Sequence, residues 1–125
     1  MTDVVTLQLP RERDFFGVAH LVLGGLGARL DLTYDVLEDM TTAIDELLGR
    51  RDAAAGDITL TVRIEEAAIT ATVGPFSGSV AEELHGSDEA LGLRRVLETS
   101  VDEVVVSERD GAQWVELTKS LEAGG

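Results

Sequence analysis

The sequence predicts an α+β fold, a two-layer sandwich with helices on one face of a mostly antiparallel sheet. Three observations support this prediction. Apolar and polar residues alternate strictly over 58–64 and again over 69–73, which is typical of a β-hairpin. Two segments with helical apolar spacing precede this hairpin and one follows it. Near the C-terminus, Arg109-Asp110-Gly111-Ala112 has the residues of a second tight hairpin turn.

Length and composition indicate a single globular domain. The chain has 125 residues, of which 44% are apolar and 27% charged, as in average domains of this size. We expect one domain over 1–121 and a disordered tail over 122–125. The sequence has no cysteine, which excludes a disulfide scaffold, a zinc–thiolate site and thiol catalysis.

The charge balance favours a basic protein partner. There are 10 Lys and Arg against 24 Asp and Glu, a formal net charge of −14. Such a surface repels phosphate backbones and anionic lipids, so we expect no nucleic-acid and no membrane binding; alternatively, the charge serves solubility alone. The longest apolar run, 15–26, is interrupted by His20 and is shorter than the roughly 20 residues of a membrane span. Without a recognisable targeting segment, the protein is expected to be cytoplasmic.

The N-terminal half predicts a strand followed by two helices. The strand covers 5–9 and ends at Pro10. The first helix covers 13–30, and its glycines either permit close packing or end the helix near Gly24. Its predicted inner face is Phe15, Val18, Ala19, Val22 and Leu26. The second helix starts at a cap, Thr33 or Asp35, and its apolar stripe is Leu37, Met40, Ile44, Leu47 and Leu48.

The C-terminal half predicts a loop region, a helix and a hairpin. The loop region spans 74–88 and includes a short helical segment at 80–84. The helix covers 89–100, with Ala90, Leu93, Val96 and Leu97 on its inner face. A strand that starts at Val104 and another over 115–121 form the last hairpin.

The stretches 38–50, 69–78 and 90–97 together resemble the motifs of the histidine-kinase-like ATPase (GHKL, or Bergerat) fold, in particular of its anti-sigma-factor serine kinase branch. The stretch 38–50 is similar to the family's acidic helix with a Glu followed four residues later by an Asn. The stretch 69–78 occupies the place of its strand-Asp-x-Gly-x-Gly motif. The stretch 90–97 is similar to its Gly-Leu-Gly-Leu-Arg segment, and Gln113 to Lys119 to its closing hairpin. The resemblance covers nearly the whole chain, but its nucleotide motifs are incomplete.

The first motif implies a catalytic carboxylate. In the family this Glu polarises the group that attacks the γ-phosphate, a role that the resemblance gives to Glu46. The family's following Asn is a magnesium ligand, but this chain has Arg50, which cannot bind a metal. Four residues apart on a helix, Arg50 and Glu46 share a face. Arg50 could therefore contact phosphate directly or pair with Glu46 on the surface.

The second and third motifs are more altered. Gly74 occupies the place of the family's Asp, which accepts a hydrogen bond from the adenine amino group. Phe76 replaces the first glycine of the family's loop, and only Gly78 is kept. We expect the Phe76 side chain to fill the nucleotide pocket as a core residue rather than to stack on a base. In the helix-start motif, Ala90 replaces a glycine and Gly92 is kept; backbone amides there could still hold a phosphate.

Other chemistries find little support. His20 and His85 have no neighbouring His or Cys, so we expect no metal site. The resemblance instead implies an anti-sigma-factor-like regulator that binds a sigma factor, an anti-anti-sigma factor or both. The segments 13–29 and 74–88 would form the contact with these partners. The resemblance further implies weak or lost binding of ATP and Mg²⁺, and it allows for a homodimer. The alternative is an active ATP-dependent serine kinase that phosphorylates the anti-anti-sigma factor. A third is an unrelated α+β domain with the same topology.

Overall fold

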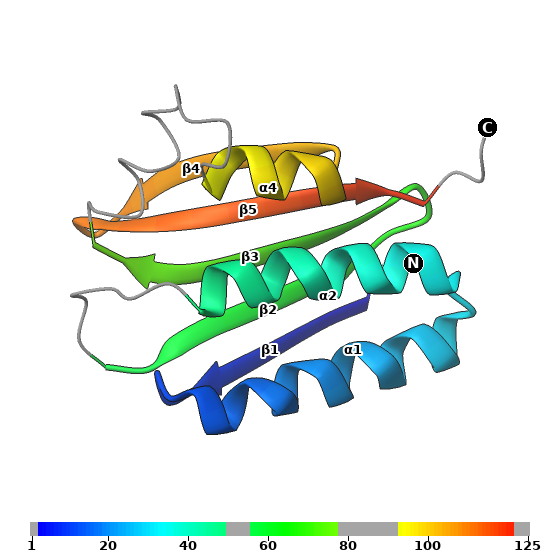
Figure 1. Ribbon diagram of the computed structural model, residues 1–125, viewed down its shortest axis with the longest axis horizontal. Helices are drawn as coiled ribbons and strands as arrows, with labels where there is room; N and C mark the ends of the chain where they lie inside the picture. The colour runs from blue at the N-terminus through cyan, green and yellow to red at the C-terminus, as the bar shows by residue number, and fades with distance from the viewer. Residues whose placement is uncertain (1–2, 50–55, 78–92, 122–125) are drawn as a thin grey trace.

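A computed structural model describes residues 3–49, 56–77 and 93–121 of the chain. They form a five-stranded sheet with helices on one of its faces (Figure 1). The sheet has the order β1-β2-β3-β5-β4, and all neighbouring strands are antiparallel. The predicted two-layer α+β sandwich is confirmed. The strands are β1 (Asp3–Leu9), β2 (Ile58–Ile64), β3 (Ala68–Phe76), β4 (Glu103–Arg109) and β5 (Ala112–Ser120), and the helices are α1 (Phe16–Leu30), α2 (Tyr34–Leu48) and α4 (Leu93–Ser100).

The register of the strands places aliphatic side chains in rows on the helix-facing side of the sheet. One such row crosses all five strands and consists of Leu7, Leu60, Val73, Val115 and Val106. Leu60, Val73 and Val115 in the middle of this row are fully buried. The strict alternation in the sequence therefore has the predicted cause, since one face of each strand is buried in the core.

Strand β3 is longer than the sequence predicts. The predicted strand ends at Val73 and a loop begins at Gly74, but the structure continues β3 to Phe76. Pairing with β5 shifts register between Val73 and Phe76, where Phe76 pairs with Gln113. The loop prediction was wrong for Gly74–Phe76 because Gly and Pro are rare inside strands, and an irregularity in the ladder accommodates both.

The predicted turn between β4 and β5 is confirmed. Asp110 and Gly111 have positive φ angles of 53° and 80°, as a two-residue hairpin turn requires. Arg109 pairs with Ala112 on either side of the turn.

Helix α1 follows a short 3-10 turn, Arg13–Phe15, and runs through its glycines to Leu30. An end near Gly24 is therefore wrong, because packing of Ala19 and Leu23 on the core outweighs the weak helix propensity of glycine. Close packing, the other expectation, holds at Gly27, where a β-carbon would lie 2.9 Å from Leu37 Cδ2 of α2.

The predicted inner face of α1 needs correction. Phe15 and Val18 are 39% and 37% exposed, whereas Leu23, which was not in the predicted face, is fully buried. The buried residues of α1 are Ala19, Leu23 and Gly27, which follow each other at intervals of four. The several glycines of this segment interrupt the helical spacing of the apolar residues. The predicted buried face therefore lies about one residue before the observed one along the helix.

Helix α2 supplies much of the core. Thr33 caps its N-terminus, because the Thr33 hydroxyl oxygen accepts a hydrogen bond from the Val36 amide at 3.3 Å. Its buried residues are Met40, Ala43, Ile44, Leu47 and Leu48, which match the predicted stripe except that Leu37 is half-buried. Leu93 and Leu97 of α4 complete the helix layer. The predicted helix over 89–100 is described only from Leu93 onward, and the predicted helical segment at 80–84 lies outside the described residues. None of the described helices is long and apolar enough to cross a membrane.

Candidate functional site

Two of the predicted nucleotide-site residues, Glu46 and Gly74, lie at one end of the sandwich. The C-terminal ends of α2 and β3 and the N-terminal end of α4 meet there (Figure 1). Glu46 lies, half-buried, in the last turn of α2, and Gly74 lies near the end of β3. The other predicted site residues, Arg50, Gly78, Ala90 and Gly92, lie outside the described residues.

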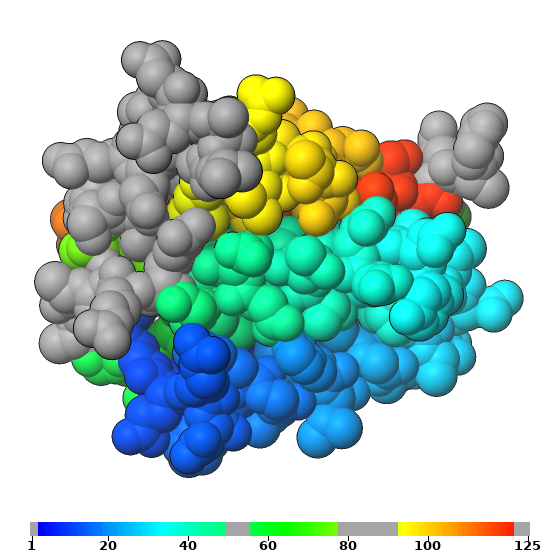
Figure 2. All heavy atoms as spheres, viewed as in Figure 1, coloured from blue at the N-terminus to red at the C-terminus, as the bar shows by residue number. Residues whose placement is uncertain are grey.

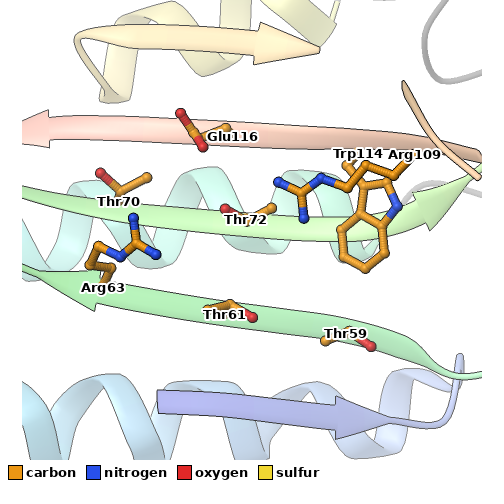
Figure 3. A pocket seen from close by; sticks show the side chains of 8 residues that line it. All are labelled: Thr59, Thr61, Arg63, Thr70, Thr72, Arg109, Trp114 and Glu116. Atoms are coloured by element: carbon orange, nitrogen blue, oxygen red, sulfur yellow. The ribbon is translucent and has the colours of Figure 1, made fainter. Parts of the chain in front are cut away.

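Gly74 is covered by the indole ring of Trp114. A β-carbon at position 74 would lie 2.6 Å from Trp114 Cδ2 and 2.7 Å from Cε3, closer than side chains approach in real proteins. Trp114 lines a groove on the sheet face that is opposite to the helices (Figure 3). Position 74 therefore has no room for a side chain, and its missing β-carbon would point toward this outer face.

Phe76 lies at the very end of β3. Its side chain is 1% exposed and belongs to the central core. The expectation that Phe76 is a core residue is confirmed. Val73 is also fully buried. At this end of β3, the core therefore receives two apolar side chains, those of Val73 and Phe76.

Arg11 ties the backbone together at this end of the sheet. Its Nε donates a hydrogen bond to the Gly56 carbonyl oxygen at 2.9 Å, and its Nη2 donates to the carbonyl oxygen of Pro75. One guanidinium thus links the end of β1 to the start of β2 and to the end of β3. The geometry suits a guanidinium, whose donors form a rigid planar fork.

The helix layer presents a second group of predicted residues, those of α1. The surfaces of α1 and α2 are in contact along the helices (Figure 2). Between them, His20 Nε2 and Asp45 Oδ1 lie 2.5 Å apart, with both side chains more than 40% exposed. On the exposed side of α1, Leu21 is 77% exposed, and β-carbons at Gly24 or Gly25 would meet nothing within 4 Å. From 15 to 28 the helix has no Asp, Glu, Lys or Arg.

Within the described residues, no group of three or more His, Asp or Glu side chains is placed to hold a metal ion. His20 pairs with Asp45 instead, and His85 lies outside the described residues.

Sequence reasoning missed two residues at this end of the molecule, Trp114 and Arg11. Trp114 contacts Gly74 because β5 pairs with β3 across a gap of about forty residues of sequence, a register that no local signal reveals. Arg11 follows Pro10, and nothing in that dipeptide indicates hydrogen bonds to a carbonyl just before β2 and to another in β3.

Comparisons with known proteins agree with this fold. No family model matches the chain. The chain is 27% identical to the serine-protein kinase RsbW of Bacillus velezensis, over 95% of this chain and 86% of the relative, and 25% identical to that of Bacillus subtilis over the same shares. RsbW of Listeria monocytogenes is 33% identical over a shorter stretch, 38% of this chain and 31% of the relative.

A solved structure extends the comparison. The crystal structure of the RsbU and RsbW domains of a Mycobacterium tuberculosis protein superposes with a TM-score of 0.72 at 16% identity. The match covers 95% of this chain and 32% of the longer mycobacterial chain, so it establishes the fold. The chain is therefore a homologue of the RsbW serine-protein kinases, with the fold that the sequence resemblance implied.

Proposed function

We propose that this protein is an anti-sigma-factor-like regulator that acts in partner switching by binding protein partners, and that its ATP binding is weak or lost. Homology to the RsbW serine-protein kinases over nearly the whole chain supports the partner-switching role. The partners in this proposal are a sigma factor, an anti-anti-sigma factor or both, met in the cytoplasm.

The observation that carries the reduced ATP binding is the contact between Trp114 and Gly74. A carboxylate that reads the adenine amino group needs a side chain at this strand end, and Trp114 occupies the space that a β-carbon at position 74 would take. The neighbouring Val73 and Phe76 are apolar and buried. Loss of a buried polar contact to the base weakens binding by about 1–3 kcal/mol.

The helix layer supplies the surface for protein partners in this proposal. Exposed apolar side chains on and just before α1, namely Phe15, Val18 and Leu21, would be covered by a bound protein. The acidic residues of α2, among them Glu38 and Asp45, would attract a basic partner and accelerate its association. The segment 74–88, expected to join this contact, is described only to Ser77.

An active serine kinase is the second candidate. It is favoured by the position of Glu46, a half-buried carboxylate in the last turn of α2, at the end of the molecule where β3 ends. In this candidate Glu46 is the general base and Arg50 clamps the phosphates. The backbone at Gly78, Ala90 and Gly92 would hold the phosphates of Mg·ATP.

Calorimetry separates the two candidates. ATP is titrated into the purified protein with and without Mg²⁺, beside a Glu46→Ala variant and an RsbW kinase as the positive control. The proposal expects no heat, or binding far weaker than that of the control. Micromolar, Mg²⁺-dependent binding would refute it, and phosphate transfer to an anti-anti-sigma factor that Glu46→Ala abolishes would establish the kinase.

Partner binding is tested separately by capture of purified sigma and anti-anti-sigma factors. Leu21→Glu changes an exposed residue of α1, so the fold should persist while binding falls. Val4→Glu is the matched control, since Val4 is also exposed but belongs to β1 of the sheet rather than to α1. Equal binding by all three proteins would contradict the proposed surface.

A further inference from the structure

The face of the sheet opposite the helices holds a shallow groove of 220 Å³ (Figure 3). Its floor consists of threonine side chains from the neighbouring strands β2 and β3, namely Thr59, Thr61, Thr70 and Thr72. The volume is that of about seven molecules of liquid water, so the groove suits a ligand of on the order of ten non-hydrogen atoms. It is smaller than the pockets of roughly 300 Å³ or more that hold drug-sized molecules.

The groove has the opposite charge to the rest of the molecule. Arg63 and Arg109 line it together with a single carboxylate, that of Glu116, which gives it a net formal charge of +1. The whole chain has a net charge of −14. In Figure 3 the two guanidiniums lie on either side of Thr72. A small anion therefore meets positive charge at both ends of this groove, whereas the acidic surface as a whole repels it.

The charged groups of the groove are not used by the fold. Within the described residues, neither arginine forms an ion pair, and neither does Glu116, which pairs with Thr72 across the ladder of β3 and β5. The guanidinium of Arg109 lies 5.3 Å from the centre of the Trp114 ring, a contact that holds it at this end of the groove. The hydrogen-bond donors of both guanidiniums therefore remain available to a ligand.

We propose that this groove binds a small α-amino dicarboxylate, an amino acid of the glutamate type. Arg63 and Arg109 would each hold one carboxylate, because a guanidinium can donate two parallel hydrogen bonds to it. Glu116 would accept hydrogen bonds from the ammonium group, which lies on the carbon chain between the two carboxylates.

The length of the groove agrees with such a ligand. Arg63 and Thr59 are four residues apart on β2, about 13 Å along the strand, and Thr59 pairs with Gly74 beneath the Trp114 ring. Arg109 contacts this ring and so marks the other end of the groove. A dicarboxylate of five carbons, with one guanidinium bound at each end, extends over a distance of this order.

Trp114 reports directly on this groove, because it lines the groove and is the single tryptophan of the chain. Sodium L-glutamate is titrated into the protein at constant ionic strength, and the change in fluorescence yields the dissociation constant. For a ligand of this size in an open groove we expect a constant on the order of 1 mM. L-Glutamine lacks the second carboxylate and glutarate lacks the ammonium group, so each should bind at least about tenfold more weakly.

Variants assign the three charged groups. Arg63→Gln and Arg109→Gln should each raise the dissociation constant of glutamate at least about tenfold. Glu116→Gln should weaken the binding of glutamate but strengthen that of glutarate, because it removes both the partner of the ammonium group and a repulsive carboxylate. Arg95→Gln is the matched control, an exposed arginine of α4 in the helix layer, and it should leave the constant unchanged.

Two further measurements make the result unambiguous. Circular dichroism confirms that each variant is folded. Equilibrium dialysis with labelled glutamate repeats the titration without fluorescence, since Arg109→Gln also changes the surroundings of Trp114. The absence of saturable glutamate binding to the parent protein would overturn the proposal. Equal binding of glutamate, glutamine and glutarate would also overturn it, as would a constant that Arg63→Gln leaves unchanged.

Discussion

The indole of Trp114 packs against Gly74 and occupies the space of the missing side chain, since a β-carbon at position 74 would lie 2.6 Å from Cδ2 of the ring. The two residues lie on neighbouring strands, and each restricts the other. Gly74 can carry no side chain while Trp114 keeps its position, and Trp114 keeps its position because Gly74 leaves the space open.

Gly74→Asp should therefore destabilise the protein rather than restore a nucleotide motif. Forcing a side chain into this contact displaces the indole, and overpacking of this kind typically costs about 1–3 kcal/mol. Chemical denaturation followed by circular dichroism measures the loss. Trp114→Ala combined with Gly74→Asp should cost less than the sum of the single changes, because the smaller residue removes the clash. Additive losses would show that the two positions do not interact.

Gly25→Ala should stabilise the protein. Gly25 is in the interior of α1, and a β-carbon there meets nothing within 4 Å. The gain expected from helix propensity is about 0.8–1 kcal/mol, measured as a higher denaturation midpoint at an unchanged slope. Gly27→Ala is the informative contrast, since its β-carbon would lie 2.9 Å from Leu37 Cδ2 and the gain should be reduced or reversed.

Arg11→Met should loosen one end of the sheet. The substitution keeps an apolar stem but removes the donors that bind the carbonyls of Gly56 and Pro75. The expected loss is about 1–3 kcal/mol, with faster amide exchange near the start of β2 and the end of β3. Arg13→Met, a change at an exposed arginine nearby, should stay within about 0.5 kcal/mol of the parent. Equal effects of both variants would contradict the proposed role of Arg11 in joining these strand ends.

The pair formed by His20 and Asp45 should contribute little to stability. Their side chains are 45% and 42% exposed, and pairs in water are worth about 0.2–1 kcal/mol. A double-mutant cycle with His20→Ala and Asp45→Ala measures the coupling. If α1 is the partner surface, His20→Ala should weaken partner binding more than it lowers stability. A coupling well above 1 kcal/mol would instead assign the pair a structural role.

The order of the elements could be read from the sequence because each has a strong local pattern. The alternation over 58–64 and the turn at Asp110 each indicate one local structure, and the structure agrees with both. Of the two caps that the sequence offered, Thr33 and Asp35, the structure uses Thr33. Errors arose where glycine weakens the pattern. The predicted buried face of α1 was misplaced, and the predicted strand ended too early, at Val73 rather than at Phe76.

The surroundings of the site depend on long-range contacts that no local pattern encodes. The sequence indicated that Gly74 lacks a carboxylate, but not that Trp114 fills the space, because this depends on the register of β3 against β5. It predicted Phe76 correctly as a core residue, although in a loop rather than in β3, since a large aromatic side chain over an apolar sheet is stabilised by burial. The roles of Glu46, Arg50 and the helix-start residues remain predictions that the binding and transfer experiments test.

The strand order also bears on how the chain folds during synthesis. Strand β5, the last of the described strands, pairs with β3 in the interior of the sheet, while β4 forms the edge beyond it. Until the ribosome has released β5, β3 has one open edge, and Val73 and Ala71 lack the cross-strand neighbours Val115 and Leu117. A nascent chain that stops before β5 would thus expose a β-edge that can pair with other chains. The sheet can be completed only after β5 has left the ribosome, and aggregation before that point is the hazard this topology carries.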